Sequence, residues 1–439
     1  MAKSRVIKSA NFNNQPFWFK GINTVWEKTY SIGTSIKLDK DRLISSARKH
    51  TGLNDLGKDF WDEPLERLLY SLNNEAKLHP VGRFISHKRI ENLLSVRLRA
   101  ENYFKKYPEI LEQPLYPGMV IIGLQRTGTT KLHRILASDN DTRALLSWEA
   151  LNPAPMNGEM KSGEKRIKIA KLNENALKIM SPGFFAIHPV EHLAPEEDVL
   201  LLDVSFLSTT PEAITNVPTY SGWLEKTDQS PAYEYTVKLL KLLQWQRPAK
   251  RWVLKTPHHL EFLDLAHKYF GDVQFIWTHR NVHEAIPSFL SMVAHSRILF
   301  SNDVDANEVA RHWVRKIGYM LSNAMDFRTK NEQQIRITDV LYKDLVSDSR
   351  SVLKRIYNNQ NLEISPELQK IFEVAEHSNP RGKYGFHHYS HEDFGIDNSF
   401  IDEFTIPYQM FQKGLKSIYT PFDFAQGDCQ TERSRSLIL

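Results

Sequence analysis

A short loop between residues 123 and 130 carries the residue types that bind an anion. It reads Gly-Leu-Gln-Arg-Thr-Gly-Thr-Thr and follows an apolar run at 119–122 that predicts a buried parallel strand. A helical pattern follows, with apolar residues at positions 132, 135 and 136. In a strand–loop–helix unit, backbone N–H groups and the helix N-terminus converge on a phosphate. Arg126 and three threonines add side-chain donors, so we expect a phosphate site here.

The loop differs from the phosphate-binding loop of nucleoside triphosphatases in the place of its cation. That motif requires Gly, four residues and then Gly-Lys-Ser/Thr. Here Gly128 is followed by Thr129 and Thr130, and the cation, Arg126, lies two residues before Gly128. The loop therefore suits a phosphate, but it lacks the lysine that reaches a triphosphate.

Three further apolar runs predict strands at 251–256, at 273–278 and, more weakly, at 335–338. Helical patterns separate these runs, including a long one at 305–327. Strands that alternate with helices indicate an α/β fold with a mostly parallel central sheet.

Charged and imidazole side chains follow two of these strands. His258 and His259 come after the strand that carries Lys255, and Arg280 follows the strand at 273–278. Because ligands of open α/β sheets bind at the carboxyl ends of the strands, we expect these residues to lie near the loop. No apolar strand ends in the lone aspartate that would hold magnesium in a nucleoside triphosphatase.

The residues before the first strand differ in character from those that follow. Residues 1–38 are rich in aromatic residues without a clear period, and we expect an irregular lead-in there. Residues 39–113 show leucine and isoleucine at helical spacing. We predict an N-terminal helical segment at 1–115 that packs on a catalytic domain at 116–420. The polar stretch at 421–439 predicts a disordered tail.

The bulk composition excludes several classes of protein. The net charge of +5 is small for 439 residues, and the chain has no long Lys/Arg run, so we expect no nucleic-acid partner. One cysteine, Cys429, excludes an intramolecular disulfide and a cysteine-built metal site. No window approaches the roughly 18 apolar residues of a spanning helix, and the start lacks the apolar region of a secretory signal. We expect a cytoplasmic protein.

Two motifs in order resemble those of the sulfotransferases. The loop at 123–130 is similar to their 5′-phosphosulfate loop, in which a basic residue precedes Ser/Thr-Gly-Thr-Thr. The segment at 278–281, with Ser288 eight residues after Arg280, looks like their 3′-phosphate motif. The resemblance to a bacterial branch of the family spans roughly residues 40–420. Its other elements are residues 51–53, 65–82, Trp148-Glu149, Pro195–Asp198, Leu254–Pro257 and 388–395.

This resemblance implies a fold akin to P-loop kinases that binds 3′-phosphoadenosine 5′-phosphosulfate (PAPS). The implied reaction moves the sulfuryl group to a hydroxyl or amine of a small-molecule, lipid or carbohydrate acceptor. Sulfuryl transfer, like phosphoryl transfer, needs positioning and charge stabilisation. Bound arginine and lysine can replace magnesium, because the transferring group carries less charge than a γ-phosphate, and no metal is expected.

The resemblance also assigns donor-binding residues. Arg280 and Ser288 should bind the 3′-phosphate, and a late loop should form a second phosphate and adenine clamp. The residues of that clamp are Arg381, Gly382 and Lys383. The residues of the 5′-phosphosulfate site are Gln125, Arg126, Thr127, Gly128, Thr129 and Thr130.

The general base has several candidates. Glu149 lies 23 residues after Arg126, where several sulfotransferase branches place a catalytic glutamate. His258 and His259 follow Lys255, as the catalytic histidine of small-molecule sulfotransferases does, and one of the two must point away. Lys255 should share the charge that develops on the sulfuryl group. Outside candidates are His188, His192, Glu196 and Glu197, which as a group could instead hold a metal, although the family uses none.

The acceptor site should lie between residues 184–224 and the N-terminal helices. Two other functions compete with sulfuryl transfer: a P-loop small-molecule kinase, and a nucleotide-binding module without catalysis. The kinase requires Gly-Lys-Ser/Thr at the loop and a magnesium-binding aspartate after a strand, and neither is present. The aromatic residues expected to line the acceptor site are Phe184, Phe185, Phe206, Tyr220 and Trp223.

Overall fold

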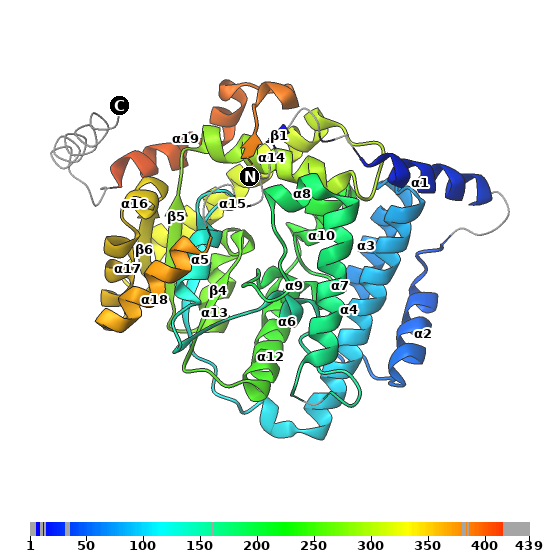
Figure 1. Ribbon diagram of the computed structural model, residues 1–439, viewed down its shortest axis with the longest axis horizontal. Coiled ribbons are helices and arrows are strands. Elements are labelled where there is room, and N and C mark those ends of the chain that lie inside the picture. Colours follow the sequence, from blue (N-terminus) through cyan, green and yellow to red (C-terminus); the bar gives the residue numbers. More distant parts are fainter. Residues whose placement is uncertain are drawn as a thin grey trace, which may run out of the picture.

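The centre of the molecule is a five-stranded parallel sheet in the order β3–β4–β2–β5–β6 (Figure 1). The computed structural model describes residues 6–8, 12, 15–30, 36–159, 161–379, 383 and 386–415. No helix in these ranges has the length and apolar content to cross a membrane. The strands of the sheet are β2 (Pro117–Ile122), β3 (Thr142–Ala144), β4 (Arg251–Lys255), β5 (Gln274–His279) and β6 (Arg336–Leu341).

Strand β2 lies in the middle of the sheet and determines what meets at its carboxyl edge. Ile121 of β2 pairs with Lys255 of β4 on one side and with Ile276 of β5 on the other. All pairings in this sheet are parallel. The segments that follow β2, β4 and β5 therefore leave the sheet at the same edge.

Alternate residues of the strands belong to two separate hydrophobic clusters. Met119 and Ile121 face one cluster, whereas Val120 and Ile122 face the other. This is the period of two that a strand requires when both faces are covered. The strands are therefore buried on both sides, as their continuous apolar runs predict.

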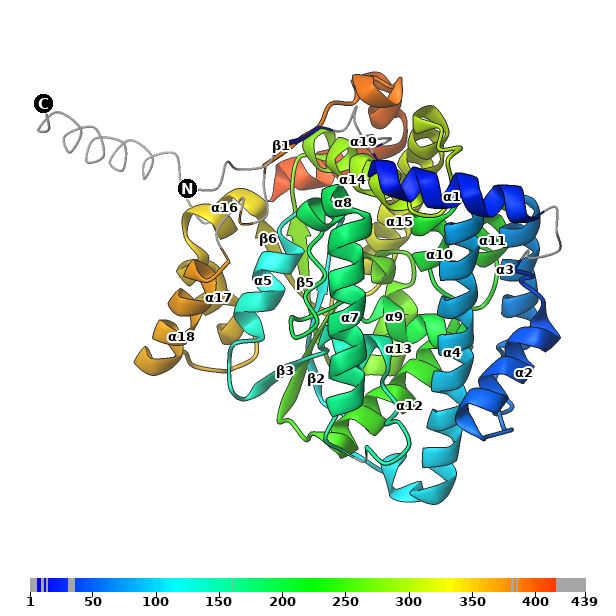
Figure 2. The same cartoon turned by 45° about the vertical axis from the view of Figure 1, so that its right-hand side comes forward.

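Helices cover the two faces unequally (Figure 2). The smaller cluster is completed by α5 (Thr129–Leu136), α16 (Tyr342–Ser347), α17 (Ser349–Asn358) and α18 (Pro366–His377). On the other face the larger cluster includes residues of α12 (Ser230–Gln246), α13 (Leu263–Phe270), α14 (Val282–Arg297), α15 (Ala306–Lys330) and α19 (Asn398–Gly414).

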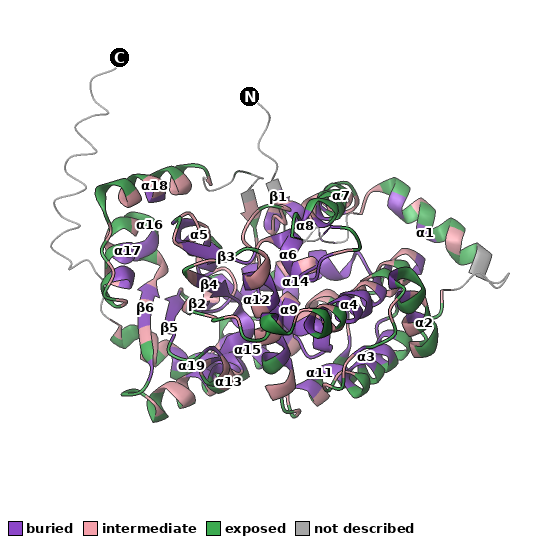
Figure 3. Ribbon diagram, turned by 90° about the horizontal axis from the view of Figure 1, so that it is seen from below, coloured by how far each residue is buried: buried purple, intermediate pink, exposed green. Residues whose placement is uncertain are grey.

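The four N-terminal helices pack on the side of the larger cluster and share its core, which includes Leu65, Ile90 and Leu94. Figure 3 shows exposed residues on the outer helices, among them α1, α2, α17 and α18, whereas β5 is buried. The four are α1 (Phe17–Tyr30), α2 (Lys40–Thr51), α3 (Asp62–Asn74) and α4 (Pro80–Lys106).

Short elements fill the space between these helices and the sheet. A small parallel pair joins β1 (Val6–Lys8) to β7 (Phe386–His388). A 3₁₀ turn, η4 (Pro257–Leu260), follows β4 directly. The remaining helices are α6 (Ser147–Leu151), α7 (Glu164–Met180), α8 (Pro182–Ile187), α9 (Val199–Leu202), α10 (Thr210–Ile214) and α11 (Pro218–Leu224).

The four predicted strands correspond to β2, β4, β5 and β6, and the α/β class with a parallel sheet is confirmed. The prediction of an irregular lead-in was wrong for residues 17–30, which form α1. Its buried face consists of little more than Phe19 and Asn23, so the apolar residues show no helical stripe. Strand β3, which has three residues, was not predicted. The tail at 421–439 lies outside the described residues.

A close contact fixes the start of α4 against the segment that follows α14. The His79 N–H donates to the Phe300 carbonyl at 3.0 Å, and the Ser301 hydroxyl donates to the Lys77 carbonyl at 2.9 Å. A Cβ on Gly82 would lie 2.0 Å from the Phe300 carbonyl oxygen. The first turn of α4 can approach this backbone only because residue 82 has no side chain.

We predict that Gly82→Ala lowers the free energy of unfolding by at least about 2 kcal/mol, because the backbone of one segment must move. Urea denaturation of the purified variant measures this loss. Gly222→Ala in α11 is the matched control, since no atom lies within 4 Å of the added Cβ. The control should gain roughly 0.5–1 kcal/mol from lower chain entropy. Equal stabilities of the two variants would contradict the role of the contact.

Candidate active site

The loop after β2 has the backbone shape of an anion-binding nest. Arg126 has φ of 69° and Gly128 has φ of 95°, both in the left-handed region. Such turns direct successive N–H groups into one concavity, and the first N–H groups of α5 add to it. A non-glycine residue held in this region is strained, and strain of this kind concentrates at functional sites. The Thr127 hydroxyl lies 2.6 Å from the Thr278 hydroxyl, which fastens the loop to β5.

Arg126 points from the loop towards the helix that follows β5. Its Nε donates to the Ser288 Oγ at 3.0 Å, although the two residues are 162 positions apart. Its Nη1 donates to the Ile187 carbonyl at 3.1 Å. The first predicted motif therefore touches the second through Ser288, which is fully buried in α14.

Arg280 reaches the same loop from the end of β5. Its Nη1 donates to the Arg126 carbonyl at 3.1 Å, and its guanidinium lies 4.6 Å from the centre of the Tyr342 ring. Glu284, one turn into α14, accepts from Arg280 at 2.8 Å. The structure thus brings Arg126, Arg280 and Ser288 together.

The late loop is described only in part. Arg381 and Gly382 lie outside the described residues. Lys383 is exposed, and its Nζ lies 3.4 Å from Glu191 Oε1. Glu191 also accepts from Arg134 of α5 at 2.6 Å. Lys383 is therefore near α5, the helix that begins at the 123–130 loop.

A cavity of about 310 Å³ lies beside the loop. Its polar lining comes from the loop, from the segment at 188–197, from the residues after β4, from the start of α10 and from α14. This lining consists of Gln125, Arg126, Thr129, Thr130, His188, Glu196, Glu197, Thr209, Thr210, Thr256, His258 and Ser296.

The rest of the cavity wall is apolar and comes mostly from α9, α10, α14 and α15. Of the five aromatic residues expected there, only Phe184 lines it. Phe206 and Tyr220 belong to the hydrophobic core, Phe185 is buried, and Trp223 packs beside Tyr220. The apolar lining consists of Leu151, Phe184, Val190, Val199, Leu200, Ala213, Ile214, Pro257, Phe289, Met292, Val293, Trp313 and Met320.

Residues 117–366, more than half of the chain, match the family model described as the sulfotransferase family. The chain belongs to the sulfotransferase family. The sulfotransferase STF1 of Mycobacterium tuberculosis is 28% identical, with a TM-score of 0.73, over 84% of this chain and 98% of that chain. STF9 of Mycobacterium avium has the same fold at 23% identity and a TM-score of 0.76, over 85% of this chain and 96% of that chain. No curated protein matches the chain.

Membership confirms the resemblance and sets the reaction class. The chain is a transferase of the sulfotransferase class with a P-loop-like fold, and its reaction is sulfuryl transfer to a small acceptor. The alternative of a small-molecule kinase is not favoured. The roles of individual residues in this sulfotransferase stay predictions, for which the positions of the side chains provide arguments.

Lys255 lies at the end of β4 and pairs with Glu197, which lines the cavity. Its Nζ is 2.6 Å from Glu197 Oε1, and the Thr256 hydroxyl donates to the other oxygen of Glu197 at 3.4 Å. Lys255 is buried, whereas a fifth of the Glu197 side chain is exposed. This ion pair places a cation and a carboxylate beside the loop.

The two adjacent histidines have different surroundings. His259 is fully buried, and its ring nitrogens contact Asp198 and Tyr233, each at 2.8 Å. His258 lines the cavity, with its Nδ1 3.2 Å from the Thr209 hydroxyl. Burial lowers the pKa of His258 to about 3, so its ring is a weak base. His259 is thus the member of the pair that points away.

Glu149 is placed apart from the cavity lining. Its Oε1 accepts from Arg143 at 2.7 Å, and its Oε2 accepts from Arg247 at 3.2 Å and from the Leu146 N–H at 3.1 Å. The side chain is buried and caps the start of α6. These contacts favour a structural role, since both oxygens are occupied.

Glu196 and His188 line the same cavity as the loop residues Gln125 and Arg126. Burial raises the pKa of the Glu196 carboxyl, although the charge of Lys255 opposes that shift. Burial lowers the pKa of His188 to about 4. His192 instead pairs with Glu174 of α7. No group of three His, Cys, Asp or Glu side chains suited to a metal occurs in the described ranges.

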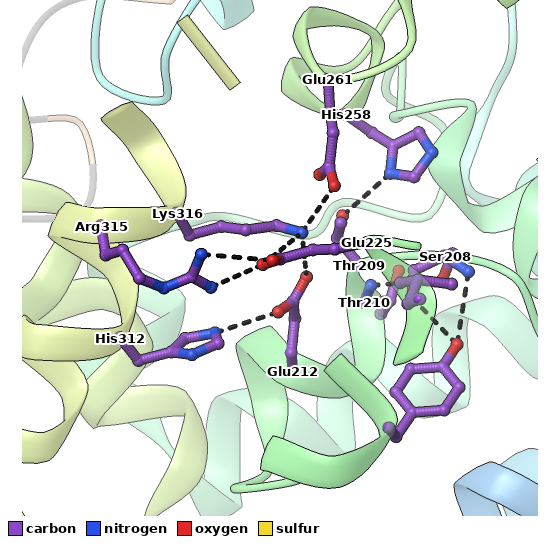
Figure 4. Close-up of polar contacts among 12 residues, drawn as sticks. Ser208, Thr209, Thr210, Glu212, Glu225, His258, Glu261, His312, Arg315 and Lys316 are labelled. Carbon is purple, nitrogen blue, oxygen red and sulfur yellow. Dashed lines mark hydrogen bonds and ion pairs between the residues drawn. The ribbon is translucent and has the colours of Figure 1, made fainter. Parts of the chain in front are cut away.

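A buried ionic cluster lies behind Thr209, Thr210 and His258 (Figure 4). Its centre is Lys316 of α15, which is fully buried. Its Nζ lies 2.8 Å from Glu261, 3.2 Å from Glu225 and 3.7 Å from Glu212. His312 contacts the second oxygen of Glu212, and Arg315 donates to both oxygens of Glu225.

The ammonium of Lys316 lies close to three carboxylates. Burial opposes the charge of Lys316, yet the carboxylates of Glu212, Glu261 and Glu225 together raise its pKa. Burial raises the pKa of Glu261 to about 7, although Lys316 opposes that shift. Sequence reasoning missed this cluster. Its signal was a lysine between Trp313, Ile317 and Met320 on the apolar face of the predicted helix.

We predict that Lys316→Met costs about 3–5 kcal/mol of stability, because it leaves buried carboxylates without their cation. Guanidinium denaturation measures the loss. Arg311→Met, on the exposed face of the same helix, is the control and should change stability by less than about 0.5 kcal/mol. A Lys316→Met variant as stable as this control would show that the cluster is not coupled to folding.

Proposed function

We propose that this sulfotransferase takes the sulfuryl group from PAPS and passes it to a hydroxyl group in the 310 Å³ cavity. The supporting observation is the contact of Arg126 with Ser288 at 3.0 Å. It joins the loop suited to a 5′-phosphosulfate to the helix suited to a 3′-phosphate. A nucleotide with phosphates at both positions spans such a pair, whereas ATP offers no 3′-phosphate.

The loop and Arg126 bind the 5′-phosphosulfate in this proposal. The nest at 126–128 and the N-terminus of α5 direct N–H groups and a partial positive charge at the anion. When the bond from sulfur to the bridging oxygen breaks, negative charge develops on that oxygen. Preorganised donors next to it lower the barrier without reorganisation. Gln125, Thr127, Thr129 and Thr130 complete this set, and Arg381, Gly382 and Lys383 bind the nucleotide from the late loop.

The acceptor loses a proton as its oxygen forms the bond to sulfur, so the site needs a base. We propose Glu196 for this role, because it lines the cavity beside the loop and burial raises its pKa above the ordinary value. The Lys255–Glu197 pair beside it holds a positive charge near the transferring sulfuryl group. The leaving group is adenosine 3′,5′-bisphosphate.

Arg280→Met should weaken the binding of adenosine 3′,5′-bisphosphate by about 30-fold or more, because a charge-assisted contact to the 3′-phosphate is lost. Binding of adenosine 5′-monophosphate, which has no 3′-phosphate, should change less than threefold. Isothermal titration calorimetry with both nucleotides makes the comparison. Equal losses for the two nucleotides would remove Arg280 from the 3′-phosphate site.

Arg336→Met is the matched control for this comparison. Arg336 is an exposed arginine at the start of β6, the far end from the loop, and pairs with Asp272. It should leave both affinities unchanged. In the same titrations ATP with magnesium should bind more weakly than the bisphosphate, and a preference for ATP would contradict the proposed donor.

The identity of the base is tested by pH–rate profiles with PAPS and an alcohol acceptor. Glu196→Gln should lower kcat at least about 100-fold and abolish the limb that rises with pH, since a glutamine cannot accept the proton. Because the pKa of Glu196 is raised, that limb should have its midpoint above 4.5 in the unsubstituted enzyme. Glu149→Gln, His258→Asn and His259→Asn should retain it. Loss of the limb in one of these three variants would transfer the role to that residue.

A further inference from the structure

Helix α14 connects the donor site to the cavity. Ser288, near its start, contacts Arg126, and the next residue, Phe289, already lines the cavity. Met292, Val293 and Ser296 follow at spacings of three, four and seven, which places them on one face of the helix. At 1.5 Å per residue, the wall formed by this face is about 10 Å long. The cavity therefore extends away from the phosphate-binding end along α14.

The walls opposite this face are also apolar. Helix α10 contributes Ala213 and Ile214, and α15 contributes Trp313 and Met320. Val199 and Leu200 of α9 close another side. A cavity of about 310 Å³ with such walls is at the lower end of the range for small-molecule sites. Most of the surface that an acceptor would touch is hydrocarbon.

The charges of the cavity are confined to its reactive end. The charged side chains in the described lining are Arg126, Glu196 and Glu197, all beside the loop or the Lys255 pair. The polar groups further along are the hydroxyls of Thr209, Thr210 and Ser296 and the ring of His258, whose lowered pKa keeps it neutral. In the described part of the lining, an anionic acceptor would therefore meet two carboxylates, and the cation there, Arg126, already contacts Ser288 and the Ile187 carbonyl.

We propose that the acceptor is a neutral alcohol with one reacting hydroxyl and an extended apolar body that lies along α14 for about 10 Å. This inference rests on the proposed function and specifies its substrate class. The hydroxyl lies between the loop and Glu196, and the apolar body lies against Phe289, Met292, Val293, Ile214 and Trp313. Sugars and carboxylated phenols do not fit, because their polar groups would be buried without partners.

A series of unbranched primary alcohols, from ethanol to dodecanol, tests the proposal. Each buried methylene contributes about 0.8 kcal/mol, so kcat/KM should rise about fourfold per carbon and then level off when the wall is filled. The assay measures release of adenosine 3′,5′-bisphosphate from PAPS. An ω-hydroxy carboxylate should react at least tenfold more slowly than the alcohol of equal length. A flat series, or a preference for glucose or for the hydroxy acid, would overturn the proposal.

Two variants show whether the dependence on chain length comes from this cavity. Ala213→Phe fills space in the wall and should end the rise two or more carbons earlier, while the affinity for the bisphosphate stays unchanged and shows that the protein is folded. Val374→Phe on exposed α18 is the matched control and should retain the full series. An unchanged series in Ala213→Phe would remove the apolar body from this cavity.

The two levels of the proposal fail in different ways. If no alcohol, sugar or phenol releases the bisphosphate from PAPS, the proposed function and the acceptor class both fall. If a sugar or an acid releases it faster than every alcohol, the donor assignment stands and the acceptor class falls. Bisphosphate release that rises with alcohol length supports both.

Discussion

The geometry of a parallel sheet determines where this protein can place hydrogen-bond donors for an anion. Parallel strands end at one edge, and β2 lies between β4 and β5, so three segments far apart in sequence leave the sheet side by side. These segments are the Gly-bounded loop after β2, the segment at the end of β4 that includes Lys255, and Arg280 after β5. The contacts of Arg126 with Ser288 and of Arg280 with the Arg126 carbonyl then join the segments directly. The position of β2 is thus the constraint on which the site depends.

The fold and the convergence of Arg126, Arg280 and Ser288 could be predicted because their signals are local. An apolar strand, a glycine-bounded loop and a basic residue at a strand end are each contained in about ten residues. The acceptor side was less accessible, because long-range partners decide which side chains reach the cavity. Glu149 is taken by Arg247, 98 positions away, and His259 by Asp198, 61 positions away. No local pattern reports such contacts, and the short helices α9 and α10 leave no periodic trace.

A mostly apolar cavity lies next to a buried ionic cluster. Beside Thr209, Thr210 and His258 of the lining, Lys316 joins α15 to three carboxylates: Glu212 of α10, Glu225 directly after α11 and Glu261 at the end of the turn after β4. Removal of one partner from a buried ion pair is costly, because the remaining charge has no compensation. The cluster therefore links α10, α11, α15 and the turn after β4, the elements beside the cavity, through one lysine.

Helix α14 contacts the loop near its start and lines the cavity with its later residues. Ser288 in its second turn contacts Arg126 of the loop, and its later residues, together with α10 and α15, form apolar walls of the cavity. Substitutions at the later positions can reshape the wall without contact to Arg126 or Arg280. Evolution can therefore change the acceptors of such an enzyme through substitutions at a few apolar positions. The residues proposed to bind the activated sulfate need not change.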